Sequence, residues 1–107
     1  IELPITIARI AGREITTGGG FFRLFPGAIT DKAVRLANER AGNPAVFYFH
    51  PWEIDPGQPR VANAPFKSKL RHYSRLGAMA GKLGRLIDAH RWGRVDDVVA
   101  TARVRMA

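Results

Sequence analysis

The chain of 107 residues contains no cysteine, which excludes disulfide frameworks, cysteine-ligated zinc sites and thiol nucleophiles. It also lacks any apolar run near the roughly 18 residues that a membrane-spanning helix needs, so we expect no membrane span. No signal-peptide pattern is present, which favours a cytoplasmic or membrane-peripheral location over secretion. Because the sequence begins with Ile1 inside a strand-like pattern, we expect it to be a piece of a longer protein.

Acidic residues are scarce in the second half of the chain. Residues 1–56 hold six Lys or Arg and six Asp or Glu, whereas residues 57–107 hold eleven and three, so the whole net charge of +8 lies on the second part. Such asymmetry is typical of proteins with an anionic partner. The basic residues are dispersed, however, so a solvated Arg-rich helical face is the alternative interpretation.

The first half reads as strands joined by glycine-rich turns. Leu3–Ile10 is rich in β-branched residues and predicts a strand, and the aromatic run Phe21–Phe25 predicts a second short one. Ala11–Gly20, which ends in three glycines, is expected to be a turn region. The glycines lack the Lys-Ser/Thr of a phosphate-binding loop, so we expect them to allow close backbone approach instead.

A helix and a third strand follow. Thr30 is expected to be the N-cap of a helix over Asp31–Ala41, with Gly42 as its C-cap. Ala45–Phe49 is a continuous apolar run that predicts a parallel strand buried on both faces. Together the segments predict a βαβ unit, and hence an α/β fold over residues 1–50.

The remainder divides into a loop and helices. Residues 51–74 contain four prolines and predict a long ordered loop, and residues 75–107 predict two C-terminal helices. One helix is indicated by apolar residues at helical spacing from Leu76 to His90, where His90 is expected to be structural. The other spans Val95–Val104.

His50 is the strongest candidate for chemistry because it ends the predicted parallel strand, where α/β proteins build their sites. An imidazole there can act as an acid, a base or a ligand, or it can simply bond a loop carbonyl. Trp52, Glu53 and Asp55 follow, and they would set an aromatic wall and carboxylates beside it. We take Trp52 and Glu53 as candidate substrate-binding residues, with loop-stabilising hydrogen bonds as the alternative for both carboxylates.

Arg23 lies within an apolar segment and needs a partner if it is buried. It is either the orienting member of an ion pair or a solvent-facing side chain. Arg71-His72-Tyr73 closes the long loop and could hold it against the rest of the fold.

At these residues the sequence resembles a known family. GGGFFRLFP, AVFYFHPWEIDPGQPRV and KLRHYSRL are similar to the C-terminal region of polysaccharide deacetylases from bacterial exopolysaccharide loci linked to the exosortase/PEP-CTERM system. The resemblance runs from about Leu3 to Trp92. It implies that the chain is the C-terminal part of a NodB-type deacetylase, a distorted (β/α) barrel that uses a divalent metal, usually zinc.

The resemblance also implies residue roles. His50 would be the general acid that protonates the leaving amine, Phe47 or Phe49 would line the pocket for the acetyl methyl group, and Arg23 would orient catalytic carboxylates. The metal ligands would lie outside this chain. The implied partners are an N-acetylated polysaccharide and the N-terminal part of the same enzyme, with no DNA. The competing hypothesis is a non-catalytic basic module that binds an anionic glycan or nucleic acid.

Overall fold

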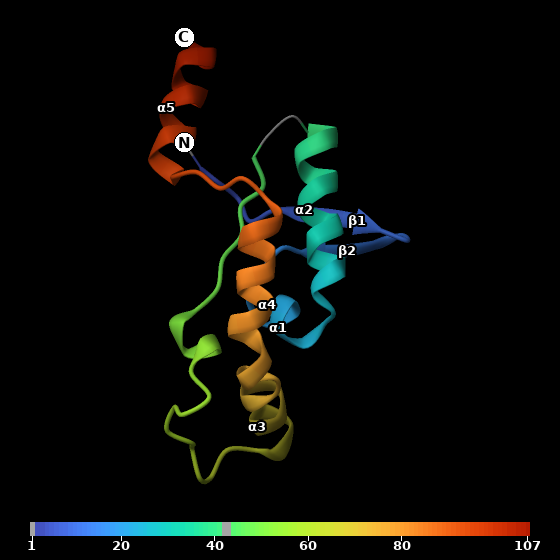
Figure 1. The fold of residues 1–107 in the computed structure, drawn as a ribbon, viewed down its shortest axis with the longest axis vertical. Coiled ribbons are helices and arrows are strands. Elements are labelled where there is room, and N and C mark those ends of the chain that lie inside the picture. The colour runs from blue at the N-terminus through green and yellow to red at the C-terminus, as the bar shows by residue number, and fades with distance from the viewer. Residues whose placement is uncertain (1, 42–43) are drawn as a thin grey trace.

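The computed structural model describes residues 2–41 and 44–107, which form a small antiparallel hairpin packed against helices. Helices α2 and α4 lie side by side along the long axis, the hairpin crosses α2, and α5 stands at one end, near the N-terminus (Figure 1). The elements, in order, are β1 (Ile7–Ile10), β2 (Arg13–Thr16), α1 (Gly19–Leu24), α2 (Gly27–Ala41), the 3-10 helix η1 (Pro51–Ile54), α3 (Phe66–Tyr73), α4 (Leu76–Ala89) and α5 (Val95–Met106).

The hairpin pairs Ile7 with Thr16 and Ile10 with Arg13. Strand β1 lies within the strand that the sequence predicts, but β2 lies in the segment predicted to be a turn. The missed signal is the Ala-Gly pair at the hairpin tip, where both residues have positive φ, 49° and 76°. Two consecutive residues of positive φ make the tight turn that suits the twist of a two-residue hairpin.

The predicted strand over Phe21–Phe25 is wrong, because Phe21–Leu24 lie in helix α1 and Phe25 is its C-cap. In a helix, residues four apart lie on one face, and Phe21 and Phe25 stack there with ring centroids 4.3 Å apart. Phe22 points the other way and is 1% exposed. A short apolar run is compatible with both a strand and a helix, and here the stacked aromatic pair favours the helix.

Helix α2 begins earlier than predicted. Thr30 is not its N-cap but lies within its first turn, where the buried hydroxyl has no hydrogen-bond partner among the described residues. The Pro26 carbonyl instead accepts a bond from the Ile29 amide at the helix start. The expected C-cap, Gly42, lies outside the described residues.

The segment before His50 is extended but is not the parallel strand that the sequence predicts. It makes one parallel bridge, between Tyr48 and Gly18. Side chains take up the backbone groups at its beginning: Asn38 bonds the Ala45 amide, Thr6 bonds the Val46 amide, and Thr17 bonds the Val46 carbonyl. In the described part of the chain, therefore, the sheet has two antiparallel strands and no βαβ unit.

The glycine run allows this segment to approach closely, as the sequence predicts. A Cβ at Gly18 would lie 2.4 Å from the Tyr48 carbonyl oxygen, and one at Gly19 would lie 2.6 Å from the Tyr48 hydroxyl. Gly19 also has a φ of 56°, which disfavours other residues. Only glycine therefore fits at these two positions while Tyr48 stays in place.

The buried residues form two small clusters. One joins Phe22 of α1 to the apolar stripe of α4, which the sequence predicts, through Met79, Leu83 and Leu86. The other joins Ala8 and Ile15 of the hairpin to α2. The described helices include none long and apolar enough to cross a membrane.

Candidate functional site

Arg23, on α1, is the buried centre of the site. Its guanidinium is 2% exposed and donates from Nε to Glu53 Oε1 at 3.3 Å. Its two other nitrogens donate to three backbone carbonyls at the end of α3: Arg71 at 2.9 Å, His72 at 2.5 Å and Ser74 at 2.9 Å. Of the two alternatives that the sequence left open for Arg23, the structure confirms the ion pair.

Glu53 links Arg23 to His50. The Glu53 side chain is fully buried, and its Oε2 accepts a bond from the His50 amide at 2.9 Å and lies 3.3 Å from His50 Nδ1. The arrangement is a capping box at the start of η1, which fixes the chain at Pro51. Because an ionised carboxylate only accepts hydrogen bonds, it favours a proton on Nδ1 and leaves Nε2 for a ligand.

The His50 ring is half-exposed at the rim of an open cavity of about 700 Å³. The cavity lies between one face of α1, the η1 turn and α3. Trp52 lines it, as expected, but His72 stacks on the indole at 4.1 Å and the Arg23 guanidinium lies 5.1 Å from its centroid. Part of the Trp52 ring is therefore already covered.

Phe47 and Phe49 do not line this cavity. Phe47 packs edge-on against Phe22 at 5.0 Å and against Trp92 at 6.1 Å, on the core side of the segment. Phe49 is 38% exposed and lies away from the lining of the cavity beside His50. Their expected role toward an acetyl group stays a prediction.

The segment predicted as a long loop contains helix α3, so the loop prediction is wrong for Phe66–Tyr73. Ile54, Val61 and Phe66 are exposed and do not anchor it. Polar contacts hold it instead: Gln58 bonds the Trp52 carbonyl and the His72 ring, and the Tyr73 hydroxyl accepts a bond from the Val61 amide. Arg71-His72-Tyr73 therefore does hold this segment against the fold, as the sequence indicates.

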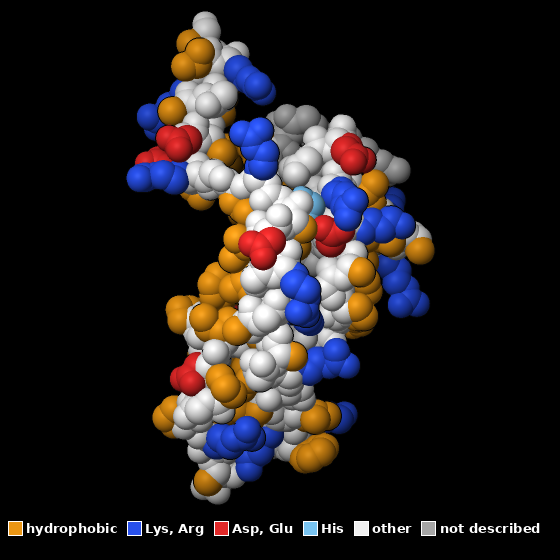
Figure 2. Space-filling view, in the orientation of Figure 1, with side chains coloured by type: hydrophobic (Ala, Val, Ile, Leu, Met, Phe, Trp, Pro, Cys, Tyr) orange, Lys and Arg blue, Asp and Glu red, His pale blue; other side chains and the backbone are white. Residues whose placement is uncertain are grey.

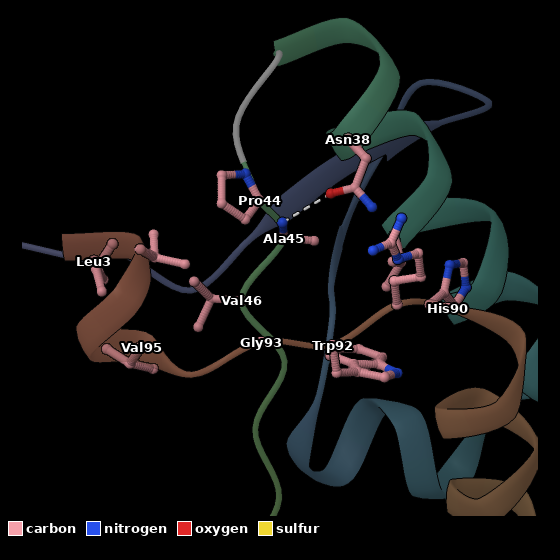
Figure 3. Close-up of a pocket in the computed structure, with 12 residues that line it drawn as sticks. Leu3, Asn38, Pro44, Ala45, Val46, His90, Trp92, Gly93 and Val95 are labelled. Atoms are coloured by element: carbon pink, nitrogen blue, oxygen red, sulfur yellow. Dashed lines mark hydrogen bonds between the residues drawn. The ribbon is translucent and has the colours of Figure 1, made fainter. Parts of the chain in front are cut away.

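A second, smaller cavity of about 100 Å³ lies beside His90 and Trp92 (Figure 3). Figure 3 shows Asn38 bonded to the Ala45 amide at its edge. His90 Nε2 lies 2.8 Å from Asp31 Oδ1, so this histidine joins α4 to α2 and is structural, as predicted. Hydrogen bonding from Arg35, and more weakly the contact with His90, lowers the pKa of Asp31 against the opposing effect of burial.

The sequence predicts Glu53 beside His50, and the structure confirms this, but the sequence does not connect Arg23 to the pair. Glu53 is buried under His50, so it does not face the cavity as the substrate-binding residue that we expected. The missed signal is the spacing of His50 and Glu53, three residues apart with Pro51 between, which is typical of a capped helical turn.

Comparison with known proteins places the chain in a family without giving it a function. No curated protein and no solved structure matches it. Residues 1–100 match the family model described as a domain of unknown function, DUF3473. Because the match covers nearly the whole chain, the protein belongs to the DUF3473 family.

Proposed function

We propose that this chain is the C-terminal part of a metal-dependent polysaccharide N-deacetylase and supplies its general acid, His50. The single observation that carries the proposal is the chain of contacts from Arg23 through Glu53 to His50 Nδ1. An imidazole oriented by a buried carboxylate, with its other nitrogen toward a cavity, is the arrangement that proton transfer requires. The resemblance to exopolysaccharide deacetylases supplies the reaction.

The reaction hydrolyses an acetamide: one water adds to the carbonyl carbon, the C–N bond breaks, and acetate leaves. The amine nitrogen must then gain a proton, or it is a poor leaving group. His50 would donate that proton from Nε2, while Glu53 stabilises the imidazolium through Nδ1. Arg23 would act as a positioning residue, because it holds Glu53 and does not itself contact His50.

A divalent metal is implied by the resemblance. In residues 2–41 and 44–107 no three His, Cys, Asp or Glu side chains come together as a ligand set, so these residues do not fit the ion. We therefore propose that the ligands belong to the N-terminal part of the enzyme, and we assign this chain only the proton transfer.

We also propose that residues 45–50 complete a (β/α) barrel with that N-terminal part. In support, Tyr48 already pairs in parallel with Gly18, and Phe49 and Ile54 are exposed beside it. An extended segment with unpaired backbone groups along one edge can pair with a strand of another part of the enzyme.

The test is His50→Ala in the full-length enzyme, assayed for acetate release from an N-acetylated polysaccharide. We expect kcat to fall roughly 10²–10⁴-fold, the usual contribution of a positioned general acid. KM and metal content should change little. The matched control is Asp55→Asn, which removes an exposed carboxylate of the same segment. Near-normal kcat in His50→Ala, or loss of the metal, would contradict the assigned role.

The positioning role is tested separately with Glu53→Gln and Arg23→Ala. Both should lower kcat less than His50→Ala. KM should stay near the wild-type value in both variants, because the polar atoms of Arg23 and Glu53 are already bonded within the protein. A loss of folded protein with unchanged kcat in the remainder would indicate a purely structural role and contradict the positioning role.

A second candidate function is a non-catalytic module for an anionic glycan or nucleic acid. It is favoured by residues 56–87, which contain seven Lys or Arg and no Asp or Glu. Binding driven by charge alone weakens steeply with salt, whereas hydrolysis at His50 should persist at moderate salt.

A further inference from the structure

We infer that the cavity beside His50 binds a negatively charged stretch of the polysaccharide, whose carboxylates contact Arg71 and Lys69. This inference rests on the proposed function, since it names the class of sugar next to the one deacetylated. It does not follow from His50 itself but from the side chains of α3 that form the opposite wall.

The cavity has unopposed positive charge. Among the described residues that line it, Glu53 is the only acid, and its two oxygens are already taken by Arg23 and His50. The guanidinium of Arg23 likewise already donates hydrogen bonds to Glu53 and to three carbonyls. What remains available to a ligand is therefore the charge of Arg71 and Lys69.

These two side chains keep free donors. Lys69 donates one hydrogen bond, to the Ala62 carbonyl, and an ammonium has three N–H groups. The Arg71 side chain has no hydrogen bond or salt bridge within the described residues, although its backbone carbonyl holds Arg23. A guanidinium matches a carboxylate in shape and can donate two parallel bonds to it.

The charge pattern of α3 carries a cost that folding does not explain. The helix contains Lys67, Lys69 and Arg71 and no acid, and Lys67 and Arg71 are four residues apart on one face. A like-charged pair at that spacing destabilises a helix by roughly 0.2–0.5 kcal/mol. Figure 2 shows a group of Lys and Arg side chains at the end of the molecule that carries α3, with others spread over the rest of this face.

The size and lining of the cavity favour a sugar over a nucleic acid. Its volume of about 700 Å³ is typical of small-ligand sites. Single-stranded nucleic acids are bound largely by stacking bases on free aromatic faces. Here Trp52 is partly covered by His72, and Arg60 lies 4.8 Å from the centroid of the Tyr73 ring.

The test is calorimetric titration of the full-length enzyme with tetragalacturonate, a carboxylated sugar oligomer. We expect saturable binding, and none with a neutral galactose tetramer. The variant Lys69→Gln/Arg71→Gln should bind at least about 10-fold more weakly. Both side chains are at the surface or half-buried, so the fold should survive, and thermal melting checks this.

The matched control is Arg103→Gln/Arg105→Gln, which removes the same charge from exposed positions of α5. It should bind within about 2-fold of the wild type. Equal weakening in both double variants would show general charge attraction and overturn the inference, as would equal binding of the neutral tetramer. Tighter binding of a single-stranded RNA oligomer than of the uronate would also overturn it.

Failure of the proposed function gives a different result. His50→Ala should keep its affinity for tetragalacturonate whatever its activity, because the carboxylate is assigned to α3. If the wild type does not bind tetragalacturonate but His50→Ala still lowers kcat as expected, the inferred anionic subsite is wrong and the proposed function stands.

Discussion

Lys82 is a single buried side chain that joins two helices. It lies on α4, 8% exposed, and its Nζ donates to the carbonyls of Phe22, Arg23 and Phe25 at the end of α1. These carbonyls belong to a helix C-terminus, which has no partners of its own for them. Burial, followed by the charges of nearby guanidiniums, lowers the pKa of Lys82, so the fold holds this ammonium through three acceptors rather than through an acid.

We predict that Lys82→Met destabilises the protein by about 1–3 kcal/mol, because it leaves buried carbonyls without a donor. For a domain of this size each kcal/mol lowers Tm by roughly 4–8 °C. Thermal melting measures the change, and Lys67→Met on the exposed face of α3 is the matched control. A Tm equal to that of the control would contradict the role of Lys82.

Asp31 makes stability depend on pH. Its pKa in the folded protein lies below the ordinary value of an aspartate, chiefly because Arg35 hydrogen-bonds its carboxylate. A carboxyl with a lowered folded pKa stabilises the fold above its unfolded pKa, and this contribution is lost as the pH falls through the folded value. We therefore predict that chemical denaturation shows a smaller loss of stability below about pH 4 in Asp31→Asn than in the wild type. Parallel curves for the two proteins would contradict this.

The segment between η1 and α3 should resist proteolysis although it has little apolar anchoring. Tyr73 bonds the Val61 amide and lies beneath Arg60, and Lys67 is inside α3. We predict slow tryptic cleavage after Arg60 and Lys67 in the native protein, because Arg23 holds the end of α3 through three carbonyls, and faster cleavage after Arg103 in α5. Mass spectrometry of timed digests measures this, and equally fast cleavage at the three sites would contradict it.

Helices with an apolar stripe could be predicted from the sequence, whereas short apolar runs without a clear period could not. The stripe from Leu76 to Leu86 defines α4 because its period of burial is that of a helix. Phe21–Phe25 and Ala45–Phe49 lack alternation, so contacts far along the chain decide their structure. For Ala45–Phe49 those contacts are the side chains of Thr6, Thr17 and Asn38, which no local pattern reveals.

The members of the site could be predicted from the sequence, and so could the place of Glu53 beside His50. His50 was identified by its position at the end of an apolar run, and Arg23 by its place inside an apolar segment. The contacts of Arg23 with the carbonyls of α3 could not be predicted, however. The prolines before α3 indicated a loop, so the helix itself was missed.

On the scale of the whole molecule, the chain is elongated, with principal extents of 53, 30 and 25 Å, and its two cores are small. We predict that the 107-residue chain alone has no deacetylase activity and binds zinc only weakly, because its described residues supply one site histidine and no ligand set. Acetate release and zinc calorimetry measure this. Turnover by the isolated chain would contradict the division of the site between two parts of the enzyme.

The partners of Arg23 also determine when the site can form during folding. Glu53, Arg71, His72 and Ser74 lie 30, 48, 49 and 51 residues along the chain from it. Closing such loops costs entropy before any contact repays it, so contacts of this range form late and slow the folding of the domain. His50 should therefore take its final orientation only after α3 has docked, and a nascent chain released before Ser74 would hold the histidine without its support.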